Sequence, residues 1–117
     1  MMKTILVVDD NPLNANLAKA ILARAGHEVD VVNSAPAALE YLKTRMPDVV
    51  LSDISMPGMS GKDLCIAIRR EEKHPTPKLI AYTAFAMKSE RQAILDAGFD
   101  DIVVKPASRD ELLRAVA

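Results

Sequence analysis

Five short apolar runs alternate with five longer segments that carry helix signals, and this alternation limits the possible fold more than any other feature. The runs are rich in Val, Ile and Leu, as expected for strands that are buried on both faces of a parallel sheet. Each intervening segment is long enough to hold a crossover helix. The sequence therefore predicts an α/β fold whose strands begin near residues 4, 28, 49, 78 and 102.

Helix-start and helix-stop residues flank the first two of the longer segments. Asn11 and Pro12 are suited to begin a helix over residues 13–25, and Gly26 is suited to end it. Ser34 is a candidate N-cap for the second helix. The side of the first helix that we expect to be buried carries Leu17, Ile21 and Leu22.

Capping boxes predict the starts of the remaining three helices. In this motif a serine is followed three residues later by an acidic or amide side chain. The three boxes are Ser60 with Asp63, Ser89 with Gln92, and Ser108 with Glu111. The first of these helices is expected to end near Glu72 and the second at Gly98.

Polar or charged side chains follow four of the five predicted strands. Asp9 and Asp10 follow the first strand, Asp53 the third, Thr83 the fourth and Lys105 the fifth, whereas no such group ends the second. This distribution fits the strand order 2-1-3-4-5, in which the second strand is an edge and the switch point lies between strands one and three. The predicted architecture is a flavodoxin-like (βα)5 three-layer sandwich that gathers these side chains at one edge.

The chemistry of these side chains indicates a metal-assisted phosphoryl site. Three carboxylates and one ammonium leave an excess of negative charge that a cation would have to offset. All candidate ligands are oxygen atoms, which favours Mg²⁺. Asp53 stands alone at its strand end and is the candidate nucleophile toward phosphorus, whereas Asp9 and Asp10 are better arranged to hold the metal. Lys105 would neutralise one phosphoryl oxygen, and the Thr83 hydroxyl would donate to another.

The composition of the whole chain excludes several classes of function. Its 117 residues fit one compact domain, here taken as residues 1–117. With 15 basic and 16 acidic groups the net charge is −1, so no global field favours nucleic acid or anionic lipid. Cys65 is the one cysteine, which excludes an internal disulfide and predicts a small core residue. No apolar run is long enough to span a membrane, and we expect a cytoplasmic protein.

Taken together, these motifs resemble the receiver domain of two-component response regulators, and the resemblance covers essentially the whole chain. The matching segments are residues 7–11, 53–61, 83–84 and 98–106. Each segment is a weak signal by itself, but their order and spacing are highly specific. The resemblance implies the fold predicted above and a role in phosphorelay signal transduction.

The resemblance also implies roles for particular residues. Asp53 would be the phosphoacceptor, and Mg²⁺ would be held by Asp10, Asp53 and the backbone carbonyl of Ser55, with Asp9 acting through water. Thr83 and Lys105 would bind the phosphoryl group, and the peptide bond between Lys105 and Pro106 is expected to be cis. The phosphoryl donor would be a sensor histidine kinase or a histidine phosphotransfer protein. The chain would catalyse only its own phosphorylation and dephosphorylation, and would not otherwise be an enzyme.

The expected output of the switch is a change at the surface formed by the fourth helix, fifth strand and fifth helix. That surface would control a downstream protein partner or an output domain, and could support a phosphorylation-dependent homodimer. Receivers usually carry tyrosine or phenylalanine at the position of Ile102, and isoleucine cannot reproduce the rotation of such a ring. We therefore expect the readout to pass through Thr83 and the loop from Ala84 to Met87. Candidates to line the surface are Phe85, Met87, Arg91, Asp100 and Arg109.

Three other functions are compatible with parts of this pattern. A Mg²⁺-dependent phosphatase of the haloacid dehalogenase type would place its nucleophile after the first strand, with a second aspartate two positions on, where this chain has Ser55 after Asp53. A flavin-binding module would use the same switch point, but the acidic first turn would repel a flavin phosphate. A phosphorylation-independent docking or dimerisation module is the main alternative, because Ile102 departs from the family pattern.

Overall fold

The computed structural model of the protein describes residues 2–71, 76–84 and 87–117, and within these it confirms the predicted α/β architecture. One five-stranded parallel sheet has the strand order β2-β1-β3-β4-β5. Strands and helices alternate along the chain as β1 (Thr4–Val8), α1 (Pro12–Arg24), β2 (Glu28–Val32), α2 (Ala35–Leu42), β3 (Val49–Ser52), α3 (Gly61–Arg70), β4 (Lys78–Thr83), α4 (Lys88–Asp96), β5 (Asp101–Val104) and α5 (Arg109–Val116).

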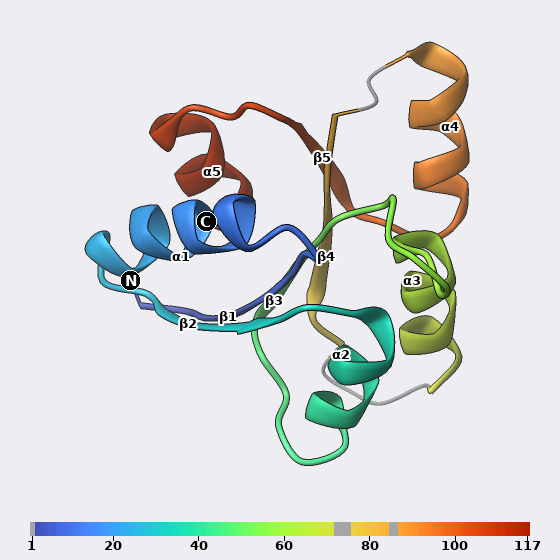
Figure 1. Ribbon diagram of the computed structural model, residues 1–117, viewed down its shortest axis with the longest axis horizontal. Coiled ribbons are helices and arrows are strands. Elements are labelled where there is room, and N and C mark those ends of the chain that lie inside the picture. Colours follow the sequence, from blue (N-terminus) through green and yellow to red (C-terminus); the bar gives the residue numbers. More distant parts are fainter. Residues whose placement is uncertain (1, 72–75, 85–86) are drawn as a thin grey trace.

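Helices cover both faces of the sheet, so that the sheet is the middle of three layers (Figure 1). Helices α1 and α5 lie on one face, and α2, α3 and α4 lie on the other. Alternate residues of the central strands point to opposite faces, so Ile5 and Val7 enter one apolar cluster while Leu6 and Val8 enter the other. Cys65 is fully buried in the second cluster, which confirms its prediction as a core residue. Among the described residues, no helix is long and apolar enough to cross a membrane.

The buried face of α1 differs from the prediction. The helix buries Ala15, Ala18 and Leu22, whereas Leu17 is 56% exposed and was wrongly assigned to the core. Two apolar stripes run along this helix, since Leu13, Leu17 and Ile21 also recur at helical spacing. The stripe with the two alanines faces the sheet because small side chains allow the helix axis to approach β1 and β2 closely.

Side-chain caps fix the start of most helices. Ser34 caps α2, and the capping boxes of Ser60 with Asp63 and Ser108 with Glu111 are both formed at the starts of α3 and α5. The predicted box at Ser89 is wrong, because α4 begins at Lys88 and its N-cap residue, Met87, makes no side-chain cap hydrogen bond. Ser89 therefore lies inside the first turn, where its own backbone is helical and cannot adopt the extended N-cap conformation.

Candidate functional site

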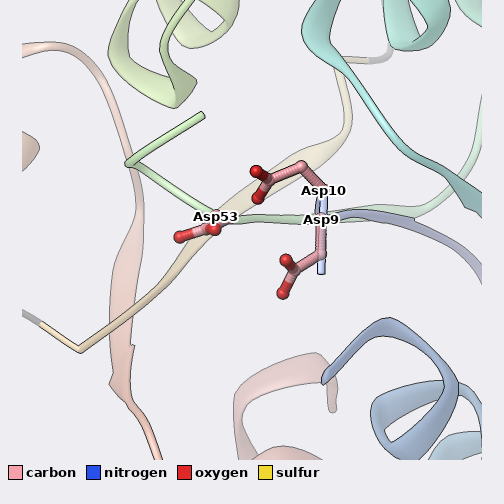
Figure 2. Close-up of side chains that lie close together, drawn as sticks. All are labelled: Asp9, Asp10 and Asp53. Carbon is pink, nitrogen blue, oxygen red and sulfur yellow. The ribbon is translucent and has the colours of Figure 1, made fainter. Parts of the chain in front are cut away.

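Three carboxylates meet where β1 and β3 end. The two strands pair in parallel with Val8 opposite Ser52, so Asp9 and Asp53 leave the sheet side by side. Figure 2 shows these two side chains together with Asp10, which follows Asp9. One oxygen atom from each carboxylate lies within 4.8 Å of the others. The structure thus brings together the three acidic residues that the sequence predicted as one group.

Asp9 is held in place by contacts to both of its carboxylate oxygens. The side chain is buried, with 1% of the residue exposed. Its Oδ1 accepts a hydrogen bond of 2.9 Å from the backbone N–H of Asn11, and its Oδ2 lies 2.9 Å from the Lys105 ammonium. Asn11 in turn accepts hydrogen bonds from the first turn of α1, so the helix start and the carboxylate position are fixed by the same residue.

Asp53 is more enclosed than a surface carboxylate, since only 8% of the residue is exposed. Burial raises its pKa and the neighbouring Asp9 raises it further, while Lys105 and the backbone N–H groups of Ile54 and Ser55 act in the opposite direction. The Ile54 N–H donates to Oδ1 over 2.8 Å, and the Lys105 ammonium lies 3.6 Å from the same oxygen. The Asp53 carboxylate is therefore held in position, and its negative charge is partly neutralised by Lys105, before any ligand binds.

Lys105 contacts both the end of β4 and the carboxylates that follow β1 and β3. Its backbone N–H donates to the Thr83 carbonyl over 2.8 Å, which continues the pairing of β5 with β4. Its side chain, 13% exposed, reaches back to Asp9 and Asp53, and its ammonium lies 4.8 Å from the centre of the Tyr82 ring. The peptide bond that follows, to Pro106, is cis as predicted.

The geometry of the acidic group fits a hard divalent cation. All three side chains offer oxygen, Asp10 is exposed and two neighbours are buried, so an ion would be bound on one side and remain open to water on the other. Mg²⁺ prefers such sites, with few carboxylates and several retained waters. A divalent ion would also relieve the repulsion among three clustered carboxylates. The role of the Ser55 carbonyl as a further ligand remains a prediction.

The loop that carries Asp53 is closed by a glycine that tolerates no side chain. Gly61, the first residue of α3, donates its N–H to the Ile54 carbonyl over 3.0 Å. A Cβ atom on Gly61 would collide with the backbone carbonyl oxygen of Asp53 and would lie 2.9 Å from the Ile54 Cα. Gly58, in the same loop, has φ +75°, a left-handed conformation that favours glycine. The Pro-Gly turn and the start of α3 therefore set the position of Asp53.

Comparison with known families identifies the family of the chain. The family model described as response regulator receiver domain matches residues 5–117. The chain belongs to this family. The chain is therefore a module of two-component signalling.

The chain is also similar to individual proteins of other organisms. The receiver is 41% identical over 115 residues to the sensor histidine kinase GacS of Pseudomonas protegens, covering 96% of this chain. It spans only 12% of that kinase. It is also 40% identical over 112 residues to an uncharacterised 14.6 kDa protein of Leptolyngbya boryana, covering 96% of this chain and 86% of the relative. Similar sequences thus occur within large sensor kinases and in a protein of about the receiver's own size.

Solved structures confirm the fold. The chemotaxis response regulator CheY4 of Vibrio cholerae superposes with a TM-score of 0.91 at 26% identity, covering 99% of this chain and 97% of that chain. The receiver domain of a sensor histidine kinase from Pseudomonas aeruginosa gives 0.89 at 32% identity, covering 99% and 95%. That structure has a magnesium ion coordinated in its active-site cleft.

Of the remaining predicted residues, Thr83 and Ala84 lie at the same edge, and Ile102 lies within β5. Thr83 ends β4 and is fully buried, and Ala84 follows it as an exposed residue. Ile102 lies in β5, half-buried against the apolar cluster on the α2, α3 and α4 face. Two residues of the predicted readout loop, Phe85 and Ala86, lie outside the described residues.

Sequence reasoning missed the part played by Tyr82. The residue was counted only as an apolar position of the fourth strand, yet its ring lies under the Lys105 ammonium. Burial raises the pKa of its phenol, with the nearby Lys105 lowering it and Asp9 raising it. The available signal was an aromatic residue directly before Thr83, on the strand that neighbours Lys105.

Proposed function

We propose that this receiver accepts a phosphoryl group on Asp53, with Mg²⁺ held by Asp9, Asp10 and Asp53. The observation that carries the proposal is the position of Asp53. Its carboxylate is enclosed at the end of β3, lies 3.6 Å from the Lys105 ammonium, and shares a metal-sized cluster with the two acidic residues that follow β1. Phosphoryl transfer requires mainly positioning and charge neutralisation, and these residues supply both.

In the proposed step, an oxygen of Asp53 attacks phosphorus and forms an acyl phosphate. The bond from phosphorus to the donor nitrogen of a phosphohistidine breaks, and the bonding electrons leave with the histidine, which takes up a proton. Bound Mg²⁺ would neutralise charge on the phosphoryl oxygens. The Lys105 ammonium, 3.6 Å from Oδ1 of Asp53, is proposed to neutralise a further phosphoryl oxygen, and the Thr83 hydroxyl is proposed to donate a hydrogen bond to another.

The proposed donor is a sensor histidine kinase or a histidine phosphotransfer protein. The relatives that are themselves sensor kinases support this choice. An apolar surface suited to a protein donor lies near the site, because Leu13 and Leu17 are 81% and 56% exposed in the first part of α1, the helix that begins shortly after Asp10. Downstream, the receiver would act on a protein partner or an output domain, in the cytoplasm.

The proposed output surface is formed by α4, β5 and α5. A phosphoryl group adds roughly −1.5 to −2 charges and can form about one to three charge-assisted hydrogen bonds, which would draw Thr83 and Lys105 toward it. A groove between the three elements is lined by Arg91, Ile102, Val104, Glu111 and Arg114, among others. Because Ile102 cannot rotate as a ring does, the change at Thr83 is proposed to reach the groove through Ala84 and the start of α4. Amide chemical shifts of Ala84 and Met87 should therefore move on adding a phosphoryl mimic.

Intact mass spectrometry with Mg²⁺ and acetyl phosphate tests the phosphoacceptor role. We expect one phosphoryl adduct, which is absent from the Asp53→Asn variant and in the presence of EDTA. The matched control is Asp96→Asn, at the exposed end of α4, which should form the adduct as the wild type does. Absence of any adduct in the wild type would contradict the proposal and favour a docking module that works without phosphate. Apart from forming and losing its own acyl phosphate, the receiver is proposed to have no enzyme activity.

A further inference from the structure

Among the described residues, the Lys105 ammonium lies close to two carboxylates and one aromatic ring, and the ring, unlike the carboxylates, offers no ligand to a metal ion. The ammonium lies 2.9 Å from Asp9 Oδ2 and 3.6 Å from Asp53 Oδ1, and both carboxylates belong to the proposed Mg²⁺ site. Its third neighbour is the ring of Tyr82, whose centre lies 4.8 Å from the ammonium nitrogen. A cation at this distance is attracted by the negative face of an aromatic ring.

Binding of Mg²⁺ changes the balance among these neighbours. A divalent ion would share the carboxylates of Asp9 and Asp53 with the ammonium, so the attraction of Lys105 to Asp9 would weaken when the site is loaded. The Tyr82 ring offers no ligand to Mg²⁺, so its attraction for the ammonium persists. The Lys105 side chain is only 13% exposed, and a cation–π contact is stronger where water is largely excluded.

The ring is a fixed surface for this contact. Tyr82 is 4% exposed and is packed in the apolar cluster with Val7 of β1 and Leu112 of α5. The base of the lysine is fixed as well, because the Lys105 N–H donates to the carbonyl of Thr83, the residue next to Tyr82. Both ends of the contact are therefore held by the pairing of β4 with β5.

We propose that Tyr82 is a positioning residue for Lys105, whose ring keeps the ammonium beside Asp53 when metal occupies the carboxylates. The proposal rests on the proposed function, since it concerns how Lys105 is kept ready for the phosphoryl group. Tyr82 touches neither phosphorus nor metal, and its effect is exerted through the lysine. A leucine in its place would fill part of the same volume but would lack the negative ring face.

The first test is an NMR measurement on protein with isotope-labelled lysine. Protons held over the face of an aromatic ring are shifted upfield, so the Lys105 methylene protons next to the ammonium should be upfield in the metal-free protein. We expect the upfield shift to persist when Mg²⁺ is added, to remain in Tyr82→Phe, and to be absent from Tyr82→Leu. Loss of the shift on adding Mg²⁺ to the wild type would overturn the proposal, without requiring any variant to fold.

The second test is the affinity of the Mg²⁺-loaded protein for beryllofluoride, a mimic of the phosphoryl group. Tyr82→Leu should weaken binding by about 5- to 30-fold, the range that a desolvated cation–π contact supports. Tyr82→Phe should restore an affinity close to that of the wild type. The matched control is Tyr41→Leu, which removes the other tyrosine, whose hydroxyl contacts Asp30 and whose ring faces Arg45. This control should leave the affinity unchanged.

The outcomes separate this proposal from the proposed function. A wild-type protein that forms no phosphoryl adduct with acetyl phosphate would refute the function itself. A wild type that forms the adduct, together with a folded Tyr82→Leu protein of unchanged affinity, would refute only the role of Tyr82. Equal losses in Tyr82→Leu and Tyr82→Phe would also refute it, because the ring would then not be the group that matters.

Discussion

Replacing Asp53 by asparagine should stabilise the metal-free receiver, although it removes the proposed phosphoacceptor. One carboxylate oxygen from each of Asp9, Asp10 and Asp53 lies within 4.8 Å of the others. At an effective dielectric constant of about 20, each such pair repels by about 3.5 kcal/mol. Asp53 takes part in two of these pairs, and its attraction to the Lys105 ammonium at 3.6 Å opposes them with about 4.6 kcal/mol.

The repulsion on Asp53 therefore exceeds its attraction by about 2 kcal/mol, and solvent at the exposed Asp10 reduces this difference. An asparagine keeps a side-chain oxygen that can accept the Ile54 N–H. We expect Asp53→Asn to raise the free energy of unfolding in EDTA by about 1–2 kcal/mol. Asp96→Asn, with its exposed carboxylate at the end of α4, is the control and should change stability by less than about 0.5 kcal/mol.

Urea denaturation at two Mg²⁺ concentrations and several pH values would measure the effect. A ligand at about 100 times its dissociation constant adds about 2.7 kcal/mol of stability, so Mg²⁺ should favour the wild type and reduce or reverse the difference. Burial raises the pKa of Asp53, so the folded protein binds the proton of this carboxyl more tightly than the unfolded chain does. The stability that this proton contributes is full below the unfolded pKa and is lost as pH rises through the folded pKa. The advantage of the variant should accordingly shrink in acid. A variant less stable than the wild type in EDTA at neutral pH would refute the reasoning.

The other predictions concern the scaffold around the site. Gly61→Ala should lower the free energy of unfolding by about 3 kcal/mol or more, because the added Cβ would displace the loop that carries Asp53. Urea denaturation would measure this change, and a loss below about 1 kcal/mol would disprove the close approach of Gly61 to the Asp53 carbonyl. Asp48→Ala should cost about 1 kcal/mol at neutral pH through the lost hydrogen bonds from the Thr4 N–H and hydroxyl. Those bonds lower the pKa of Asp48, so the loss of stability in Asp48→Ala should be full above the unfolded pKa of Asp48 and should vanish as pH falls through its folded pKa. Thermal melts at a series of pH values would measure this loss. Ser108→Ala should cost about 1 kcal/mol and Ser89→Ala less than about 0.5 kcal/mol, and equal losses would contradict the assigned start of α4.

The contrast between two helix starts shows where local sequence is sufficient. Ser108 and Glu111 form their predicted box because the whole motif lies within four consecutive residues and the helix begins directly after it. Ser89 and Gln92 have the same spacing, yet α4 begins before them and Gln92 contacts Asp96 instead. The spacing of the two residues of a capping box does not by itself determine the residue at which the helix begins.

The sequence by itself determined the order of strands and helices, the parallel sheet and the polar residues that end the strands. These features depend on residues close together in the chain and on topological rules shared by all parallel sheets. The grouping of Asp9, Asp10 and Asp53 followed from those rules without any coordinates.

Only the tertiary structure decided which side of α1 is buried and what surrounds Lys105. Two apolar stripes on α1 were equivalent as patterns, and the choice between them depended on how closely the helix packs against the sheet. The contact of Lys105 with the Tyr82 ring depends on the register of β5 against β4 and on the packing that fixes the ring. Residues so far apart in the chain become neighbours through packing over the whole domain, which no local pattern encodes.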